Sequence, residues 1–106
     1  MTGFDKRGDG FEKKFAHDED LRFRAEARRN KKLGLWAAEK LGQSGAGAEA
    51  YAKSVVAADF EEKGDEDVFR KIRADFDAAG VAQSDHQIRR TMDELMAIAM
   101  EEIRKA

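Results

Sequence analysis

The fold is decided most clearly by residues 84–105, which read SDHQIRRTMDELMAIAMEEIRK. Ser84 and Gln87 have the spacing of a capping box, in which each side chain accepts a hydrogen bond from a backbone N–H at the start of a helix. Apolar residues then recur every three or four positions, so that a helix gathers them on one face. They are Ile88, Met92, Leu95, Met96, Ala99 and Ile103. The stretch therefore predicts an amphipathic helix over residues 85–105.

Two shorter stretches upstream have the same period and are bounded by glycine. Residues 46–63 follow Ser44-Gly45 and stop before Gly64. Residues 66–79 lie between Asp65, as N-cap, and Gly80. The first apolar face comprises Ala48, Tyr51, Ala52, Val55, Val56 and Phe60, and the second comprises Val68, Phe69, Ile72 and Phe76. No segment alternates with period 2 over a strand length, so we expect no sheet.

A further helix is predicted over residues 18–41, with Gly42 as a left-handed cap. Its second half carries a stripe that can dock on the other helices, formed by Leu33, Trp36, Ala37 and Leu41. Residues 18–32 are nearly all charged, and Leu21 and Ala25 are their only apolar pair at core spacing. Because a polar helix is not held by packing, we expect this half to project beyond the bundle or to lie loosely on it.

The first 17 residues differ from the rest of the chain. Gly3, Gly8 and Gly10 each cost about 1 kcal/mol in a helix interior, so we expect disorder in the free chain. Phe4, Phe11 and Phe15 nevertheless fall within roughly 40° of one another on a helical wheel. Two interpretations stay open: the segment folds into a helix on a partner, or its Phe side chains pack back on the bundle.

These predictions define an all-α fold, a four-helix bundle-like domain over residues 18–106 with a flexible N-terminal arm over residues 1–17. Short connections favour an antiparallel up-down arrangement. No run approaches the 20 apolar residues of a membrane-spanning helix, and no apolar signal core follows Met1, so we expect a cytoplasmic protein without direct membrane insertion.

The composition argues against catalysis and metal binding. The 106 residues include no Cys, which excludes disulfides, thiol catalysis, iron–sulfur clusters and the common zinc sites. Neither His17 nor His86 has a Glu three positions before it, as a di-iron bundle requires. Because no pairing of a nucleophile with a base is visible, we expect no enzyme, no metal and no cofactor.

The net charge of −2 hides an asymmetry, since residues 1–42 carry +3 and residues 43–106 carry −5. The basic residues cluster at Arg22, Arg24, Arg28, Arg29, Lys31 and Lys32. They could bind nucleic-acid phosphates, but a nucleic-acid-binding domain is usually basic overall. An acidic protein surface fits better, and a solvated helix face is the plain alternative.

The glycine-rich stretch 42–47 precedes a predicted helix, and helix N-termini bind phosphate. A nucleotide-sensing module that binds ATP or ADP is therefore the alternative function. However, no strand precedes the stretch, and the Lys-Ser or Lys-Thr pair of a phosphate-binding loop is missing. A plain turn between helices is favoured.

Several runs together resemble a known family. They are residues 11–18 (FEKKFAHD), 27–31 (ARRNK), 34–42 (GLWAAEKLG) and 58–61 (ADFE), with Gly64 and Asp67-Val68 further on. The chain resembles the zeta-subunit family, small inhibitor proteins of alphaproteobacterial F-type ATP synthases. The resemblance covers essentially the whole chain, and residues 34–42 are its most specific part.

The resemblance implies a four-helix regulatory subunit that inhibits ATP hydrolysis by the F1 sector. We expect the free protein to be a monomer. The resemblance also implies that the arm inserts at an alpha/beta catalytic interface near the gamma subunit, so that the protein is peripheral to the membrane through F1. The positions matched to the arm are residues 11–17, with Phe11, Lys13, Lys14, Phe15 and His17 as its partner-binding side chains, and the basic stretch from Arg22 to Lys32. Phe4, from the Phe row, is assigned to the same arm. Gly8 and Gly10 depart from the better helix formers expected there, which weakens the expected inhibition.

Overall fold

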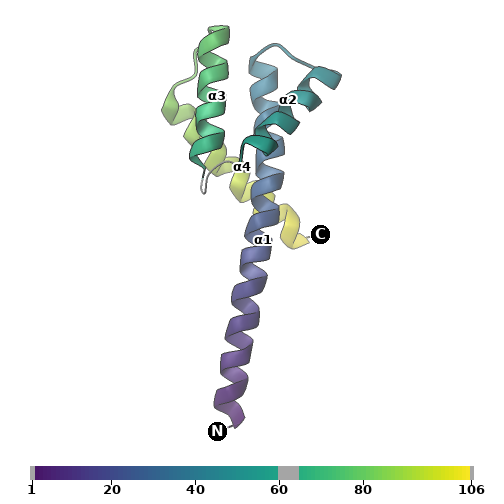
Figure 1. The fold of residues 1–106 in the computed structure, drawn as a ribbon, viewed down its shortest axis with the longest axis vertical. Helices are drawn as coiled ribbons and strands as arrows, with labels where there is room; N and C mark the ends of the chain where they lie inside the picture. Colours follow the sequence, from purple (N-terminus) through teal and green to yellow (C-terminus); the bar gives the residue numbers. More distant parts are fainter. Residues whose placement is uncertain (1, 60–64, 106) are drawn as a thin grey trace.

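A computed structural model describes residues 2–59 and 65–105, with side chains from residue 19 onward. Within these residues there are four helices and no strand, which confirms the all-α prediction. They are α1 (Thr2–Lys40), α2 (Gly45–Ala58), α3 (Glu66–Ala79) and α4 (Asp85–Lys105). Figure 1 shows α1 as the long axis of the molecule, with the other three helices gathered around its C-terminal half. The molecule is correspondingly elongated, measuring 64 × 24 × 21 Å.

Successive helices alternate in direction, as predicted for short connections (Figure 1). Helix α2 returns beside α1, α3 runs in the direction of α1, and α4 descends obliquely across it. Helices α1 and α2 approach so closely at one point that a Cβ added to Gly34 would lie 2.5 Å from the Ala52 Cα. Gly34 thus permits this crossing because it has no side chain.

The core forms where the predicted apolar stripes meet. Its buried members are Leu33 and Ala37 from α1, Val55 from α2, Val68, Phe69, Ile72 and Phe76 from α3, and Ile88 and Met92 from α4. The Trp36 and Phe76 rings meet edge to face, with centroids 5.7 Å apart and planes inclined by 61°. The stripes of α3 and α4 are confirmed, whereas Phe60 lies outside the described residues.

Local signals set several helix ends as predicted. The Ser84 N–H donates to Gln87 Oε1 at 2.8 Å, and the Gln87 N–H donates to Ser84 Oγ at 3.1 Å, which confirms the capping box. Gly80 and Gly42 adopt φ values of 71° and 80°, in the left-handed region that glycine favours. Asp65 is the N-cap of α3 but makes no side-chain capping hydrogen bond. Its carboxylate binds Arg29 instead.

Two predicted boundaries were wrong. Helix α2 ends at Ala58 instead of at Lys63, because Asp59 already caps it in a turn; residues 60–64 lie outside the described residues. Helix α1 begins at Thr2 instead of near Asp18. Glycine lowers helix stability but does not end a helix, and no proline interrupts this stretch, so the helical backbone runs through it. The predicted flexibility of residues 1–17 stays a prediction.

The middle of α1 also differs from the expectation that residues 18–32 project or lie loosely. Ala25, Arg29 and Asn30 are all buried there, with exposed fractions of 0%, 2% and 1%. Polar partners on neighbouring elements hold this part of α1 against the body. Only the segment N-terminal to it extends past the other helices (Figure 1).

Candidate functional site

The predicted arm corresponds to the N-terminal part of α1. Its backbone is a continuous extension of the helix, and Figure 1 shows no other helix beside it. The side chains predicted to bind a partner there lie outside the described residues; they are Phe4, Phe11, Lys13, Lys14, Phe15 and His17. The uninterrupted backbone retains the helical register on which the predicted Phe row depends.

Arg29 was predicted to face a partner, whereas the structure buries its side chain, which is 2% exposed. The Arg29 Nη2 donates to Asp65 Oδ1 at 2.9 Å, and its Nε donates to Asn30 Oδ1 at 2.7 Å. The Asn30 side-chain amide in turn donates to Asp59 Oδ2 at 2.9 Å. A buried guanidinium requires such partners, since an unpaired buried charge is strongly destabilising.

These contacts join α1 to both ends of the connection between α2 and α3. We call Arg29, Asn30, Asp59 and Asp65 the buried polar cluster after its two buried members, Arg29 and Asn30; Asp59 is half-buried, and the Asp65 side chain is 50% exposed. Burial raises the pKa of the Asp59 carboxyl above its ordinary value, although the hydrogen bond from Asn30 and the charge of Arg29 oppose the shift. The cluster holds the polar middle of α1 against the body, together with the buried Ala25.

Arg28 and Lys32 engage the last turns of α4. The Arg28 Nε donates to Glu102 Oε1 at 2.9 Å, and the Lys32 Nζ lies 3.0 Å from the same oxygen. Hydrogen bonds from Lys32 and then Arg28 hold the pKa of the Glu102 carboxyl below its usual value. This ion-pair clamp, formed by Arg28, Lys32 and Glu102, joins α4 to α1 C-terminal to the projecting segment.

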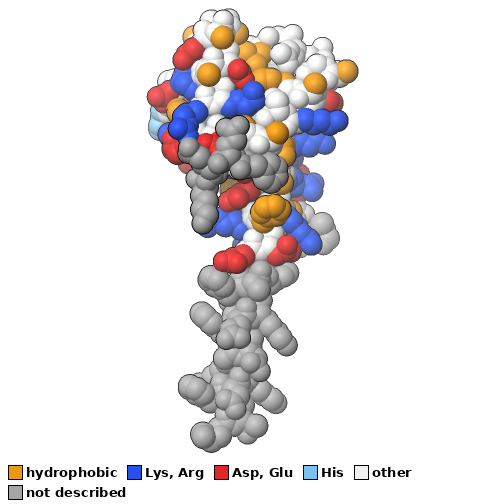
Figure 2. Space-filling model, viewed as in Figure 1, with side chains coloured by type: hydrophobic (Ala, Val, Ile, Leu, Met, Phe, Trp, Pro, Cys, Tyr) orange, Lys and Arg blue, Asp and Glu red, His pale blue; other side chains and the backbone are white. Residues whose placement is uncertain are grey.

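The remaining residues of the predicted basic cluster, Arg22, Arg24 and Lys31, are exposed. Arg22 and Arg24 form ion pairs one turn away, with Glu26 at 3.4 Å and Asp20 at 3.3 Å, and their side chains are 74% and 67% exposed. Such exposed pairs contribute little to stability, so both guanidinium groups can exchange partners. Lys31 is also exposed and lines a hollow of about 240 Å³ between α1 and α2. Figure 2 shows one face of the molecule, over whose described part basic and acidic side chains are interleaved.

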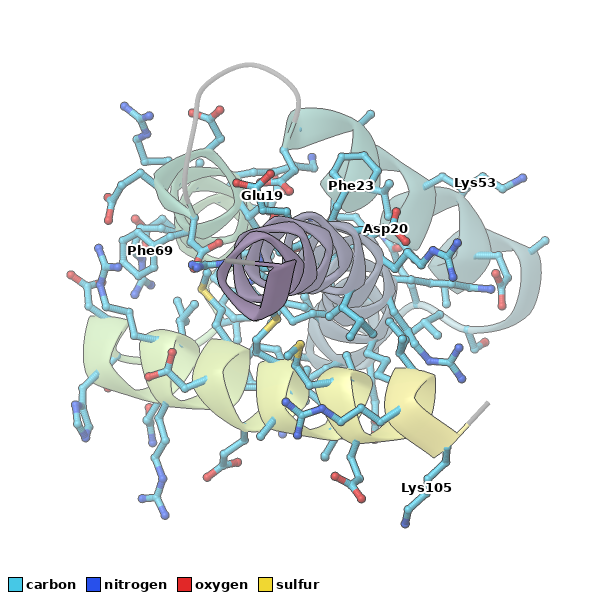
Figure 3. All side chains as sticks on the ribbon, turned by 90° about the horizontal axis from the view of Figure 1, so that it is seen from below. Glu19, Asp20, Phe23, Lys53, Phe69 and Lys105 are labelled. Carbon is cyan, nitrogen blue, oxygen red and sulfur yellow. The ribbon has the colours of Figure 1, made fainter. Side chains whose placement is uncertain are left out.

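Two apolar surface features lie near the base of the arm. Phe23 is 63% exposed and, as Figure 3 shows, points to the α2 side of α1, away from α4. On the α4 side, a hollow of about 490 Å³ is lined by Leu21, Arg22, Met96, Met100 and Arg104. Met96 belongs to a predicted apolar stripe, but a stripe alone does not tell which of its members remain uncovered.

The glycine-rich stretch 42–47 forms an exposed turn and the first residues of α2. Gly42 and Gly45 have positive φ values, which supports the favoured interpretation of a turn between helices. The nucleotide-sensing alternative stays a prediction. Among the described residues, no group of three His, Asp or Glu side chains could hold a metal ion. None of the described helices is long and apolar enough to span a membrane.

Comparison with known proteins gives a family and a fold. The sequence pattern of a family described as ATPase inhibitor subunit zeta matches residues 1–102. The chain is also similar to a protein whose structure was determined by solution NMR, with 48% sequence identity and a TM-score of 0.71. That match covers 80% of this chain and 96% of the other. No curated protein matches the chain.

Proposed function

Since the chain belongs to the ATPase inhibitor subunit zeta family, and is thereby an inhibitory regulator of ATP synthase that acts on its F1 sector, we propose that its N-terminal arm blocks ATP hydrolysis by entering an alpha/beta catalytic interface. The arm comprises residues 1–17. Occupation of that interface prevents the closure and rotation that each hydrolysis cycle needs. The protein itself supplies no chemistry.

The observation that carries this proposal is the shape of α1. It is a helix of 39 residues whose C-terminal half is packed in the body, while its N-terminal part extends beyond the other helices (Figure 1). At 1.5 Å per residue, residues 2–18 span about 25 Å, enough for a single helix to reach deep into a cleft. A narrow rod on a wider body is a suitable shape for an inhibitor that must enter an interface without dissociating it.

The packed helices, which form the body of the protein, determine the direction in which the arm extends from them. The buried polar cluster and the ion-pair clamp hold α1 on two sides, through Asp59 and Asp65 on one and through Glu102 on the other. A helix fixed in this way presents its extension in a limited range of directions, which reduces the orientational entropy lost on binding.

Charge assists the encounter. Arg22 and Arg24 lie exposed at the base of the arm, and Lys13 and Lys14 lie within it. Basic side chains on the entering segment accelerate association with an acidic surface, and the effect weakens as salt is added. The predicted Phe row then supplies apolar anchors inside the cleft, where burial of each aromatic ring offsets part of the cost of ordering the arm.

The proposal is tested by titrating purified F1 with the chain and measuring ATP hydrolysis. We expect the double variant Phe11→Ala/Phe15→Ala to require at least ten times more protein for half-inhibition, because hot-spot aromatic residues contribute more than about 1.4 kcal/mol each. Phe23→Ala is the matched control, since it removes an exposed Phe from the same helix outside the arm. We expect it to inhibit like the unchanged chain.

Deletion of residues 1–17 provides the stricter experiment. The core residues Leu33, Val55, Ile72 and Ile88 all lie outside the deleted segment, so the shortened chain should keep its helical circular dichroism and thermal transition. If it inhibits hydrolysis as strongly as the full chain, the arm is not the inhibitory element. If the Phe double variant loses stability but inhibits normally, the Phe row packs on the body instead.

A further inference from the structure

The hollow between α1 and the C-terminal half of α4 is an open apolar corner. Leu21 from α1 and Met96 and Met100 from α4 are its apolar members, and each is only half-buried. Met96 and Met100 are one helical turn apart, and in Figure 3 the methionine sulfur atoms of α4 lie on the side of that helix that faces α1. Methionine side chains are flexible and polarisable, so they adapt to an apolar ligand of irregular shape.

Two guanidinium groups line the same hollow. Among the described side chains, Arg104 is exposed and forms no ion pair, and Arg22 pairs with Glu26 at 3.4 Å. On α4, Glu101 pairs with Lys105 at 3.6 Å, and Glu102 is bound by Arg28 and Lys32. Neither carboxylate pairs with Arg104. The hollow thus combines an apolar floor with positive charge at its edge.

We propose that this hollow is a second contact with the F1 sector, and that it receives an amphipathic helix of the partner with an apolar row flanked by carboxylates. The proposal rests on the proposed function, because it takes F1 as the partner. Apolar side chains of that helix would fill the corner beside the methionines, and its carboxylates would pair with Arg22 and Arg104, which suit bidentate recognition.

The position of the hollow supports this occupant. Leu21 and Arg22 lie directly C-terminal to the arm, and α4 crosses α1 just beyond them (Figure 1). A partner whose cleft receives the arm along the α4 side of α1 brings the rim of that cleft against this corner. The hollow is therefore continuous with the proposed inhibitory surface, whereas Phe23 lies on the opposite side of α1 (Figure 3).

The two contacts have separable effects. The arm stops catalysis, so its loss reduces inhibition even when the protein is bound. The hollow adds affinity, so its loss raises the concentration needed, while saturating protein still inhibits fully. Because the second contact includes charge pairs, its share of the affinity falls with added salt.

The test uses the full chain and purified F1. Binding of the chain to F1 held on a surface and the rate of ATP hydrolysis by F1 are both measured. We expect Arg104→Glu to weaken binding about tenfold, while inhibition at saturation remains complete. Arg90→Glu is the matched control, since it makes the same charge change on an exposed face of α4 outside the hollow. Met100→Gln tests the apolar floor independently, because it keeps the side-chain length, and we expect it to weaken binding as well.

The proposal is overturned if Arg104→Glu and Met100→Gln both bind F1 as tightly as the unchanged chain. It is also overturned if these two variants change the sedimentation of the isolated protein, because a second copy of the chain would then occupy the hollow. A third contrary result is tighter F1 binding through the hollow after deletion of the arm, because the arm itself would then occupy the hollow in the free protein. If the Phe11→Ala/Phe15→Ala variant binds F1 normally but does not inhibit it, the second contact is supported. If no variant and no unchanged chain binds F1, the proposed function itself fails.

Discussion

Replacement of Gly34 by alanine should destabilise the protein, although alanine is the better helix former. An ideal Cβ at this position lies 2.5 Å from the Ala52 Cα, 3.1 Å from its Cβ and 3.3 Å from its carbonyl oxygen. Two of these three atoms belong to the backbone of α2, which cannot rotate away as a flexible side chain can. The substitution therefore forces α1 and α2 apart at their crossing.

The magnitude follows from two opposing contributions. Overpacking of a closely packed contact costs about 1–3 kcal/mol. The change from glycine to alanine inside a helix returns up to about 1 kcal/mol. The 2.5 Å approach to a backbone atom places the cost at about 2–3 kcal/mol, the upper part of that range. We therefore expect a net loss of about 1–2 kcal/mol in the free energy of unfolding, which lowers Tm by about 4–8 °C for each kcal/mol in a domain of this size.

Gly47→Ala is the matched control. Gly47 lies in α2, and a Cβ added there meets no atom within 4 Å. The same chemical change should therefore leave Tm unchanged or raise it by a few degrees. Both variants are compared by thermal and urea denaturation followed by helical circular dichroism. If Gly34→Ala raises Tm as Gly47→Ala does, the two helices are not held at this crossing and the reasoning fails.

Two further predictions concern titration. Burial, together with the hydrogen bond from its hydroxyl to Asp75 (2.7 Å) and the charge of that carboxylate, raises the pKa of Tyr51 well above its usual value of 10.0. Folded protein should keep the Tyr51 proton above pH 10 while unfolded protein loses it, so the free energy of unfolding falls as pH rises above 10. The phenolate absorbance of this single tyrosine reports the titration. Asp75→Asn should shift the titration to lower pH, because it removes the carboxylate. The pKa of Glu102 is lowered, so its contribution is present above the unfolded pKa of about 4.5 and is lost as pH falls. Glu102→Gln should therefore lower Tm slightly at neutral pH and make little difference in acid, where Glu102 is itself protonated, so that the loss of Tm on acidification is smaller than in the unchanged chain. An unchanged acid profile would mean that the ion-pair clamp is absent in solution.

The parts of the fold that the sequence predicted well depend on local interactions. The bounds of α3 and α4 match their predictions because a left-handed Gly80 and the Ser84–Gln87 capping box act within a few residues. Their apolar stripes are regular enough to identify the core. In such stretches the pattern, the cap and the stop all agree, which is the condition under which sequence reasoning succeeds.

The middle of α1 shows why the packing of residues 18–32 was not predicted. Its apolar pattern is weak because Arg29 and Asn30 occupy buried positions, and their partners, Asp59 and Asp65, are about 30 positions away in the sequence. Periodicity counts only apolar residues, so it assigns a buried arginine to the solvent. A usable signal was present in the four-residue spacing of Ala25, Arg29 and Leu33, which places Arg29 on the buried face of the helix.

The continuity of α1 connects this buried polar cluster to inhibition. Beginning a helix is costly because a whole turn must be fixed for one hydrogen bond, whereas extending an existing helix adds one bond for each residue fixed. The body holds α1 firmly from Ala25 onward, so an arm that becomes ordered on F1 needs only to extend a helix that already exists. The glycines at positions 3, 8 and 10 then set the cost of that extension at about 1 kcal/mol each. The strength of inhibition should thus depend on the balance between these glycines and the anchoring Phe row, while the polar core of the body keeps the starting helix in place.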